Sequence, residues 1–162
     1  MEFNLFTINR KGLVFKSYEI IGETLPDYTV KSEGLFFKSM LFYDHNNQPV
    51  LSVNRVSKLF IKEYEIIRDG SKIAGITEVS TFTKPQINIR SQLGDFTISG
   101  NFFRNDFTVL KNEVEVAKIS RKQLRAKGFY GIAINASEDH EFILALVMLM
   151  EMNIQEQKAS SG

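Results

Sequence analysis

The chain has 162 residues, no cysteine and a formal net charge of +1; 43% of its residues are hydrophobic and 24% are charged. This length fits one domain with a sizeable core, and the composition is that of a globular rather than a disordered protein. The lack of cysteine excludes disulfides, thiol catalysis and thiolate metal sites, and the near-neutral charge gives no overall attraction to nucleic acid or acidic lipid.

The N-terminal segment reads MEFNLFTINRKGLVFKSYEIIG. It lacks a basic stretch followed by a long apolar run and a small-residue cleavage site, which together mark a signal peptide. We therefore expect no signal peptide and a cytoplasmic protein.

Turn-forming residues separate short apolar runs along most of the chain. The segment Asp44–Pro49 divides two such runs, Asp69-Gly70 divides two more, and Lys111-Asn112 stands between a third pair. Asp-Gly favours a two-residue hairpin turn, because both central positions need a positive φ. Turn signals spaced about every 8–12 residues are typical of an all-β sandwich or barrel.

An internal repeat indicates an architecture of two related halves. A shift of 66 positions places Gly34-Leu35-Phe36-Phe37-Lys38 on Gly100-Asn101-Phe102-Phe103-Arg104. The same shift, without a gap, matches Asn46 with Asn112 and Tyr64 with Tyr130. We interpret the pattern as two copies of one β-meander unit. The alternative is that any two antiparallel meanders share aromatic and branched residues at even spacing.

The C-terminal part of the chain predicts a helix over residues 138–152. Ser137 is a suitable N-cap, and three acids between 138 and 141 favour the positive end of a helix dipole. The nine residues from Phe142 to Met150 are all apolar. A helix without a polar face is either buried on every side or surrounded by lipid.

Length favours burial of this helix over a transmembrane span. A span needs about 20 apolar residues, and the flank before the helix is acidic. The only material that can enclose the helix is β-sheet, and barrels of about eleven strands hold a central helix. We therefore predict a mainly β protein with a large closed antiparallel barrel of about twelve strands around a hydrophobic C-terminal helix. Residues 1–154 form this single domain, and residues 155–162 are expected to be a disordered tail.

Several weak motifs across nearly the whole chain resemble the LURP-one-related family. They are the block Val116–Lys122, Tyr130-Gly131-Ile132, the acidic cap with the helix Phe142–Met152, the Gly-x-Phe-Phe motifs at Gly34 and Gly100, and Phe82–Ile87. The resemblance implies the fold of the tubby C-terminal domain and the phospholipid scramblases, in which twelve strands enclose a hydrophobic helix. This fold agrees with the prediction made from the residues.

The resemblance implies less about function. Tubby domains bind phosphoinositides and scramblases act on phospholipids, but no position of this chain matches tubby's lipid-binding residues. The chain also has no tryptophan, which relatives often carry in the loop that reads Gln123-Leu124-Arg125-Ala126 here. No site residue is therefore transferred from the family.

The sequence offers no positive sign of catalysis, metal binding or a cofactor. Its two histidines, His45 and His140, fall in a hairpin turn and at a helix start. There is no Gly-x-Ser-x-Gly nucleophile turn and no phosphate-binding glycine loop. Two separate histidines cannot form a histidine-rich metal site, and Ser137–Glu141 lacks the glycine of a calcium loop. We expect a protein that is not an enzyme and that has no metal or cofactor.

One basic stretch is the candidate binding site. It contains five cations and no acid, namely Lys118, Arg121, Lys122, Arg125 and Lys127. Lysine and arginine both bind phosphate and anionic headgroups. The alternative is a solvated loop whose charge is balanced by acids elsewhere, such as Glu113 and Glu115. Nucleic-acid binding would need a broader basic face.

Three functions follow in order of preference. The first is a binding module for a phospholipid headgroup or another anionic ligand, with peripheral membrane contact at most and no transmembrane span. The second is a protein-interaction or regulatory scaffold that uses strand edges or exposed aromatics. The third is a scramblase-like lipid transporter, which would need the last helix in the bilayer. The sequence does not predict an oligomeric state.

Overall fold

The structure is a computed structural model that describes residues 2–11, 17–33, 39–58, 61–77, 86–101, 106–120 and 129–160. This part of the chain forms twelve β-strands and one α-helix. The strands are β1 (Phe3–Lys11), β2 (Ser17–Gly22), β3 (Tyr28–Glu33), β4 (Ser39–Tyr43), β5 (Pro49–Lys58), β6 (Ile61–Arg68), β7 (Ser71–Thr77), β8 (Gln86–Ser91), β9 (Gly94–Asn101), β10 (Asp106–Lys111), β11 (Val114–Ser120) and β12 (Phe129–Asn135). The helix, α1, spans His140–Ser160.

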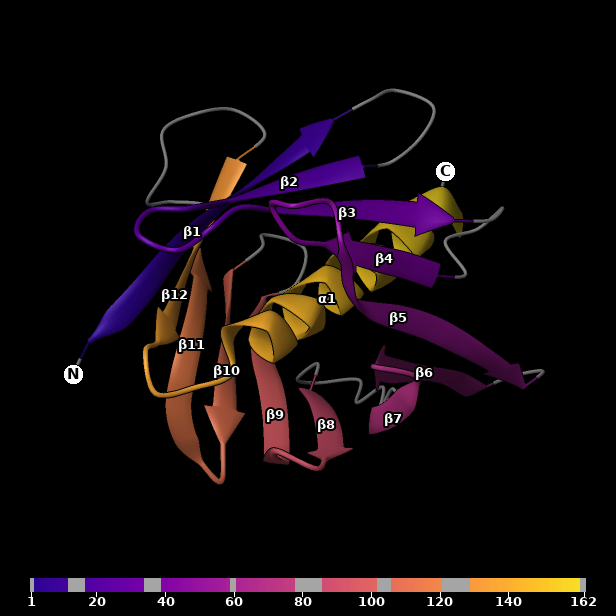
Figure 1. Ribbon diagram of the computed structural model, residues 1–162. Coiled ribbons are helices and arrows are strands. Elements are labelled where there is room, and N and C mark those ends of the chain that lie inside the picture. The colour runs from indigo at the N-terminus through magenta and orange to yellow at the C-terminus, as the bar shows by residue number, and fades with distance from the viewer. Residues whose placement is uncertain are drawn as a thin grey trace.

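The strands form one closed antiparallel barrel around α1. Each strand pairs with its neighbours in sequence, and β1 closes the ring by pairing with β12. Figure 1 shows the strands arranged around the helix, which runs through the interior. The predicted fold, a closed barrel of twelve strands that encloses a C-terminal helix, is confirmed.

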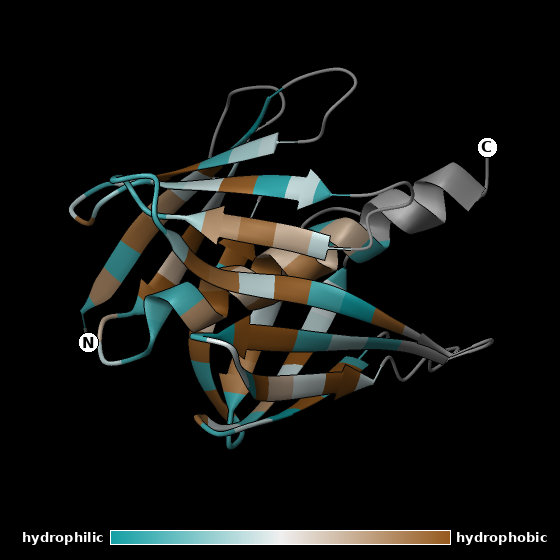
Figure 2. Ribbon diagram, turned by 45° about the vertical axis from the view of Figure 1, so that its right-hand side comes forward, coloured by the Kyte–Doolittle hydropathy of each residue, from teal (hydrophilic) through white to brown (hydrophobic). Residues whose placement is uncertain are grey.

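The alternation of side chains along each strand produces the core. In β4, Met40 and Phe42 are buried while the residues between and beside them are partly exposed. The same alternation repeats around the ring, and Figure 2 shows hydrophobic and hydrophilic residues in turn along the strands. Because successive side chains of a strand point to opposite faces, one apolar set from every strand converges on the barrel interior.

The helix fills that interior. Every residue from Phe142 to Asn153 is buried, and the Phe142 ring packs 5.2 Å from the ring of Phe96 on β9, measured between centroids. Burial of a large apolar side chain stabilises the fold by roughly 1.5–3 kcal/mol relative to exposure. No helix in the described part of the chain is long and apolar enough to cross a membrane.

The start of α1 differs from the prediction. The helix begins at His140, and its N-cap is Asp139, whose Oδ1 accepts a hydrogen bond from the Phe142 amide at 3.0 Å. Ser137 instead donates from its amide and its hydroxyl to Asn135 Oδ1, at 3.0 and 2.9 Å. The prediction of Ser137 as the cap is therefore wrong. An aspartate cap also places its negative charge at the positive end of the helix dipole.

The end of α1 also lies beyond the predicted end at residue 152. The helix continues through Ser160, so residues 155–160, which we expected to be disordered, are helical. Gln, Glu, Lys and Ala predominate after residue 154, and all four have high helix propensity. The end of the apolar run does not mark the end of the helix, because polar residues with high helix propensity continue it.

Two hairpin turns illustrate how local sequence sets the strand connections. Asp69 and Gly70, with φ values of 52° and 74°, form the predicted two-residue turn between β6 and β7. The turn between β10 and β11 consists of Asn112 and Glu113, with φ values of 48° and 68°, one residue later than predicted. Positive φ at both central positions is the geometry that joins twisted antiparallel strands.

The two halves of the barrel correspond at the offset seen in the sequence. Adding 66 to the bounds of β4 gives residues 105–109, which overlap β10. The same offset takes each of the first six strands onto the strand six places later. The Phe36-Phe37 and Phe102-Phe103 pairs of the repeat lie outside the described residues. The interpretation as two copies of one meander unit therefore agrees with the strand order.

Candidate functional site

Of the five basic residues predicted to form a binding site, the structure describes Lys118. It is exposed on β11, where it lies opposite Thr108 of β10 and Ala133 of β12. Arg121, Lys122, Arg125 and Lys127 lie outside the described residues. That these four residues lie close to Lys118 therefore stays a prediction.

A groove of about 460 Å³ lies on the outer face of β2, β1 and β12, and its residue Ala133 lies opposite Lys118 of β11. Its outward-facing lining comprises Leu5, Thr7, Ile21, Glu23, Gly131 and Ala133. Leu5 is 46% exposed and Ile21 is 37% exposed, so two large aliphatic side chains stand on the outer surface of the barrel here. The groove exists because β12 carries only glycine and alanine here, whereas the neighbouring strands carry large side chains.

The residues of this groove form a row that ends in opposite charges. Glu23, just after β2, donates its amide to the Leu5 carbonyl at 2.9 Å, so the two residues are neighbours. Leu5 lies opposite Ala133, and Ala133 lies opposite Lys118. With adjacent strands about 4.8 Å apart, Glu23 and Lys118 stand roughly 14 Å apart across the row. The surface therefore carries an acid, two apolar residues and a base in that order.

The sequence contained a signal for this groove that the prediction did not use. Leu5-Phe6 and Ile20-Ile21 are adjacent apolar residues inside strands. Since neighbouring residues of a strand face opposite sides, one member of each pair has to face outward. Phe6 and Ile20 are buried, which leaves Leu5 and Ile21 on the surface.

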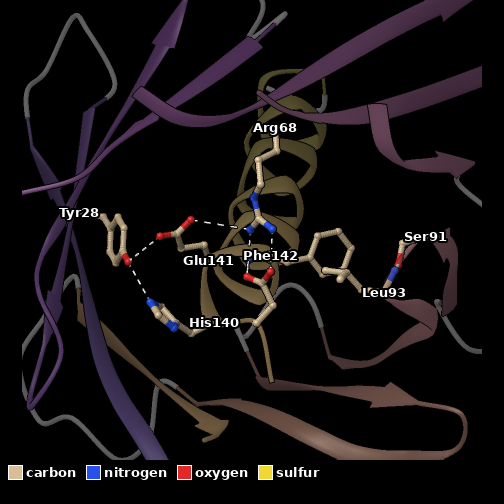
Figure 3. Close-up of polar contacts among 8 residues, drawn as sticks. Tyr28, Arg68, Ser91, Leu93, His140, Glu141 and Phe142 are labelled. Carbon is tan, nitrogen blue, oxygen red and sulfur yellow. Dashed lines mark hydrogen bonds and ion pairs between the residues drawn. The ribbon is translucent and has the colours of Figure 1, made fainter. Parts of the chain in front are cut away.

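A second group of polar side chains lies where α1 begins (Figure 3). Both terminal nitrogens of Arg68, on β6, donate to the Asp139 carboxylate at 2.7 and 2.9 Å. Burial raises the pKa of Asp139, but hydrogen bonds from Arg68 and from the Phe142 amide outweigh it and hold the pKa below its usual value. Lys111 of β10 pairs with Glu138 at 2.9 Å. These contacts fasten the helix start to two strands.

His140 takes part in the same group. The Tyr28 hydroxyl donates to Glu141 Oε1 at 3.1 Å and lies 2.8 Å from His140 Nε2. Because the phenol has one proton, His140 Nε2 is the donor in the second contact. The imidazole also stacks on Phe6, with ring centroids 5.8 Å apart. This histidine therefore anchors the first turn of α1 to β1 and β3, whereas His45 is exposed in a turn.

A third polar contact lies further along the helix. Glu151 is 6% exposed and accepts hydrogen bonds from Tyr18 at 3.4 Å and Tyr130 at 3.3 Å. An Arg10 nitrogen lies 3.9 Å from the same carboxylate. Burial, reinforced by the charge of Glu151, raises the pKa of both tyrosines. The one acid within the buried part of α1 is thus bound by residues of β1, β2 and β12.

Comparison with known proteins identifies the family. The sequence profile described as LURP-one-related matches residues 4–151. The chain belongs to the LURP-one-related family. Its structure is similar to the X-ray structure of the protein AT5G01750 of Arabidopsis thaliana, with a TM-score of 0.65 and 16% identity over 91% of this chain and 89% of that chain. At this identity, the likeness shows only that the two proteins share a fold.

A search of curated proteins finds no match to this LURP-one-related chain. Among the described residues, no group of three or more His, Cys, Asp or Glu side chains could hold a metal ion. Family membership thus confirms the resemblance seen in the sequence and leaves the ligand to be inferred from the surface.

Proposed function

We propose that this LURP-one-related protein is a non-enzymatic binding module that recognises an anionic, phosphate-bearing ligand, first of all a phospholipid headgroup, on the outer face of β11 and β12. The observation that carries the proposal is the position of Lys118. Its side chain is exposed two residues before the end of β11, and the residue opposite it on β12, Ala133, lines the apolar groove. A lysine beside an apolar surface suits a ligand that has an anionic headgroup.

The electrostatic surroundings of Lys118 support this role. Lys11, Arg68 and Lys111 each pair with a carboxylate at 2.7–2.9 Å. Within the described residues, no carboxylate forms an ion pair with Lys118. Among these residues, no carboxylate therefore competes with a ligand for the charge of Lys118. The four further cations of the stretch follow within nine residues of sequence, and each basic residue near an anionic surface contributes roughly 1 kcal/mol.

Vesicle sedimentation tests the proposal. We expect the protein to sediment with phosphatidylcholine vesicles that contain phosphatidylserine, to stay in solution with pure phosphatidylcholine, and to be released by salt. Lys118→Glu should weaken sedimentation by at least about fivefold, since it removes one positive charge worth roughly 1 kcal/mol and adds a negative one. The matched control is Lys72→Glu, an exposed lysine on β7, which lies away from β11 and β12 in the ring. Equal recovery with neutral and anionic vesicles would remove the basis of the proposal.

A protein-interaction scaffold is the second candidate. Closure of the barrel gives each described strand two neighbours, so a partner strand has no open edge to join. What favours this candidate is the outward apolar surface of Phe3, Leu5 and Ile21. Binding that survives Lys118→Glu but not Leu5→Ser would favour it over the first.

We do not propose a scramblase-like transporter. That function would place α1 in lipid, whereas the described strands enclose its buried segment, Phe142 to Asn153.

A further inference from the structure

We propose that the groove over β2, β1 and β12 holds the hydrocarbon chain of a single amphiphilic molecule whose anionic headgroup is bound at Lys118. This inference rests on the proposed function and deepens it, because it adds a site for the apolar part of the ligand. The proposal is supported by the shape of the groove, by its size and by the opposite charges at the two ends of the row from Glu23 to Lys118.

The shape of the groove comes from the residues of β12. Gly131 and Ala133 point outward from this strand and leave little bulk above the backbone, while Leu5 and Ile21 rise from β1 and β2 on one side. Thr7, opposite both Ile21 and Gly131, is the one polar side chain in the middle. A floor of small residues beside larger aliphatic ones makes a channel for an apolar chain.

The charges at the ends of the row orient the ligand. Glu23 stands at the β2 end and Lys118 at the β11 end, with Leu5 and Ala133 between them. An anionic headgroup is attracted to the lysine and repelled by the glutamate. The chain of the same molecule then lies over Ala133 and beside Leu5, where burial removes apolar surface from water. This complementarity selects an anionic amphiphile over a cationic one.

The size of the groove favours a small ligand over a protein partner. Its volume of about 460 Å³ falls within the range of roughly 300–1,000 Å³ typical of small-molecule sites. Nine residues line it, whereas a stable protein interface uses about 20–30 residues on each side. Three of the four large exposed apolar side chains in the described part of the chain, Phe3, Leu5 and Ile21, lie on this face.

The experiment compares three probes by isothermal titration calorimetry: dodecyl phosphate below its micelle concentration, inorganic phosphate, and dodecyl maltoside. We expect dodecyl phosphate to bind at least tenfold more tightly than inorganic phosphate, a gain that about two buried methylenes supply. Dodecyl maltoside should bind at least threefold more weakly than dodecyl phosphate, because it has no charge for Lys118.

A filling substitution tests the position of the chain. Ala133→Phe adds a bulky, strand-compatible side chain to the groove floor, so dodecyl phosphate should bind this variant no more tightly than inorganic phosphate does. The matched control is Val114→Phe, which adds a phenyl ring at an exposed strand position outside the groove. The Val114→Phe variant should keep the full gain in affinity that the dodecyl chain gives over inorganic phosphate. Circular dichroism of both variants checks that the barrel has folded.

The outcomes separate this inference from the proposed function. One outcome is that phosphate binding depends on Lys118 but dodecyl phosphate binds no more tightly than inorganic phosphate. This outcome would overturn the groove assignment and leave the proposed function standing. Equal affinity for dodecyl maltoside and dodecyl phosphate, unchanged by Lys118→Glu, would keep the chain in the groove but overturn the headgroup site and the proposed function. Tight chain binding that Ala133→Phe leaves unchanged would overturn the groove assignment. A dimer in sedimentation equilibrium that Leu5→Ser dissociates would also overturn it, by assigning this face to a second copy of the chain.

Discussion

The guanidinium of Arg68 donates two hydrogen bonds to the carboxylate of Asp139, at 2.7 and 2.9 Å, across 71 residues of sequence. The same carboxylate accepts the Phe142 amide and caps α1. Asp139 therefore satisfies a free helix N–H and also ties the helix start to β6. Paired geometry of this kind between arginine and a carboxylate is stronger than a single neutral hydrogen bond.

Replacement of Asp139 by alanine should destabilise the protein, whereas replacement of Ser137 should not. Asp139→Ala removes the cap and the Arg68 pair, so we expect the free energy of unfolding to fall by about 1.5–3 kcal/mol. Ser137→Ala is the matched control, because its hydroxyl binds Asn135 rather than the helix; its effect should stay within about 0.5 kcal/mol. Urea unfolding measures both. Equal losses from the two variants would contradict the assignment of the cap.

Acid should weaken the same contact. The pKa of Asp139 is held below 3.8, so on acidification the unfolded chain binds a proton at this position before the folded protein does. The contribution of Asp139 to stability is therefore fully present above the ordinary carboxyl pKa and is lost as the pH falls below it. We expect Asp139→Asn to show a smaller loss of unfolding free energy than the wild type between about pH 6 and about pH 3. Urea titrations at each pH measure the loss, and a variant as acid-sensitive as the wild type would contradict the lowered pKa.

The fold could be predicted because its main features are local or periodic in the sequence. The nine apolar residues from Phe142 to Met150 leave α1 without a polar face, so burial follows from that segment alone. The recurrence of similar residues 66 positions later likewise indicates that six strands are followed by six similar strands. Neither inference requires knowledge of which strands pair.

The features that the sequence did not predict depend on contacts between distant residues. Ser137 and Asp139 are both good capping residues, and Asp139 alone is bound by Arg68, which belongs to another element. The groove depends on the register that sets Leu5 beside Ala133 and Ala133 beside Lys118. The alternation of side chains along a strand indicates that Leu5 or Phe6 faces outward, but the pairing of three strands decides which residues lie next to it.

A charged residue in the middle of α1 should abolish the fold. Leu146 is fully buried, so Leu146→Asp would place a carboxylate without a partner in the barrel interior. The penalty of several kcal/mol is comparable to the total stability of a typical domain, about 5–15 kcal/mol. Circular dichroism should show loss of the native signal. Val114→Asp, at a position 59% exposed, is the control and should change stability by less than about 0.5 kcal/mol. A folded, stable Leu146→Asp protein would contradict the enclosed helix.

Alkaline pH should unfold the protein through its buried tyrosines. Burial, with nearby acids adding to it, raises the pKa of Tyr18, Tyr28 and Tyr130 above the ordinary value of 10. Above that pH the unfolded chain loses these protons more readily than the folded protein, so stability that is complete below it declines as the pH rises. Each such phenol contributes a slope of up to about 1.4 kcal/mol per pH unit.

Tyr130→Phe isolates one of these phenols. The variant loses the hydrogen bond to Glu151 at 3.3 Å, so its stability near neutral pH should fall by about 1 kcal/mol. Its decline above pH 10 should nevertheless be shallower than that of the wild type, because one fewer proton is released on unfolding. Phenolate absorbance followed together with circular dichroism measures both effects. If the absorbance of all three phenols rose while the folded signal stayed intact, the tyrosines would be titrating in the native barrel, and their enclosure around α1 would be contradicted.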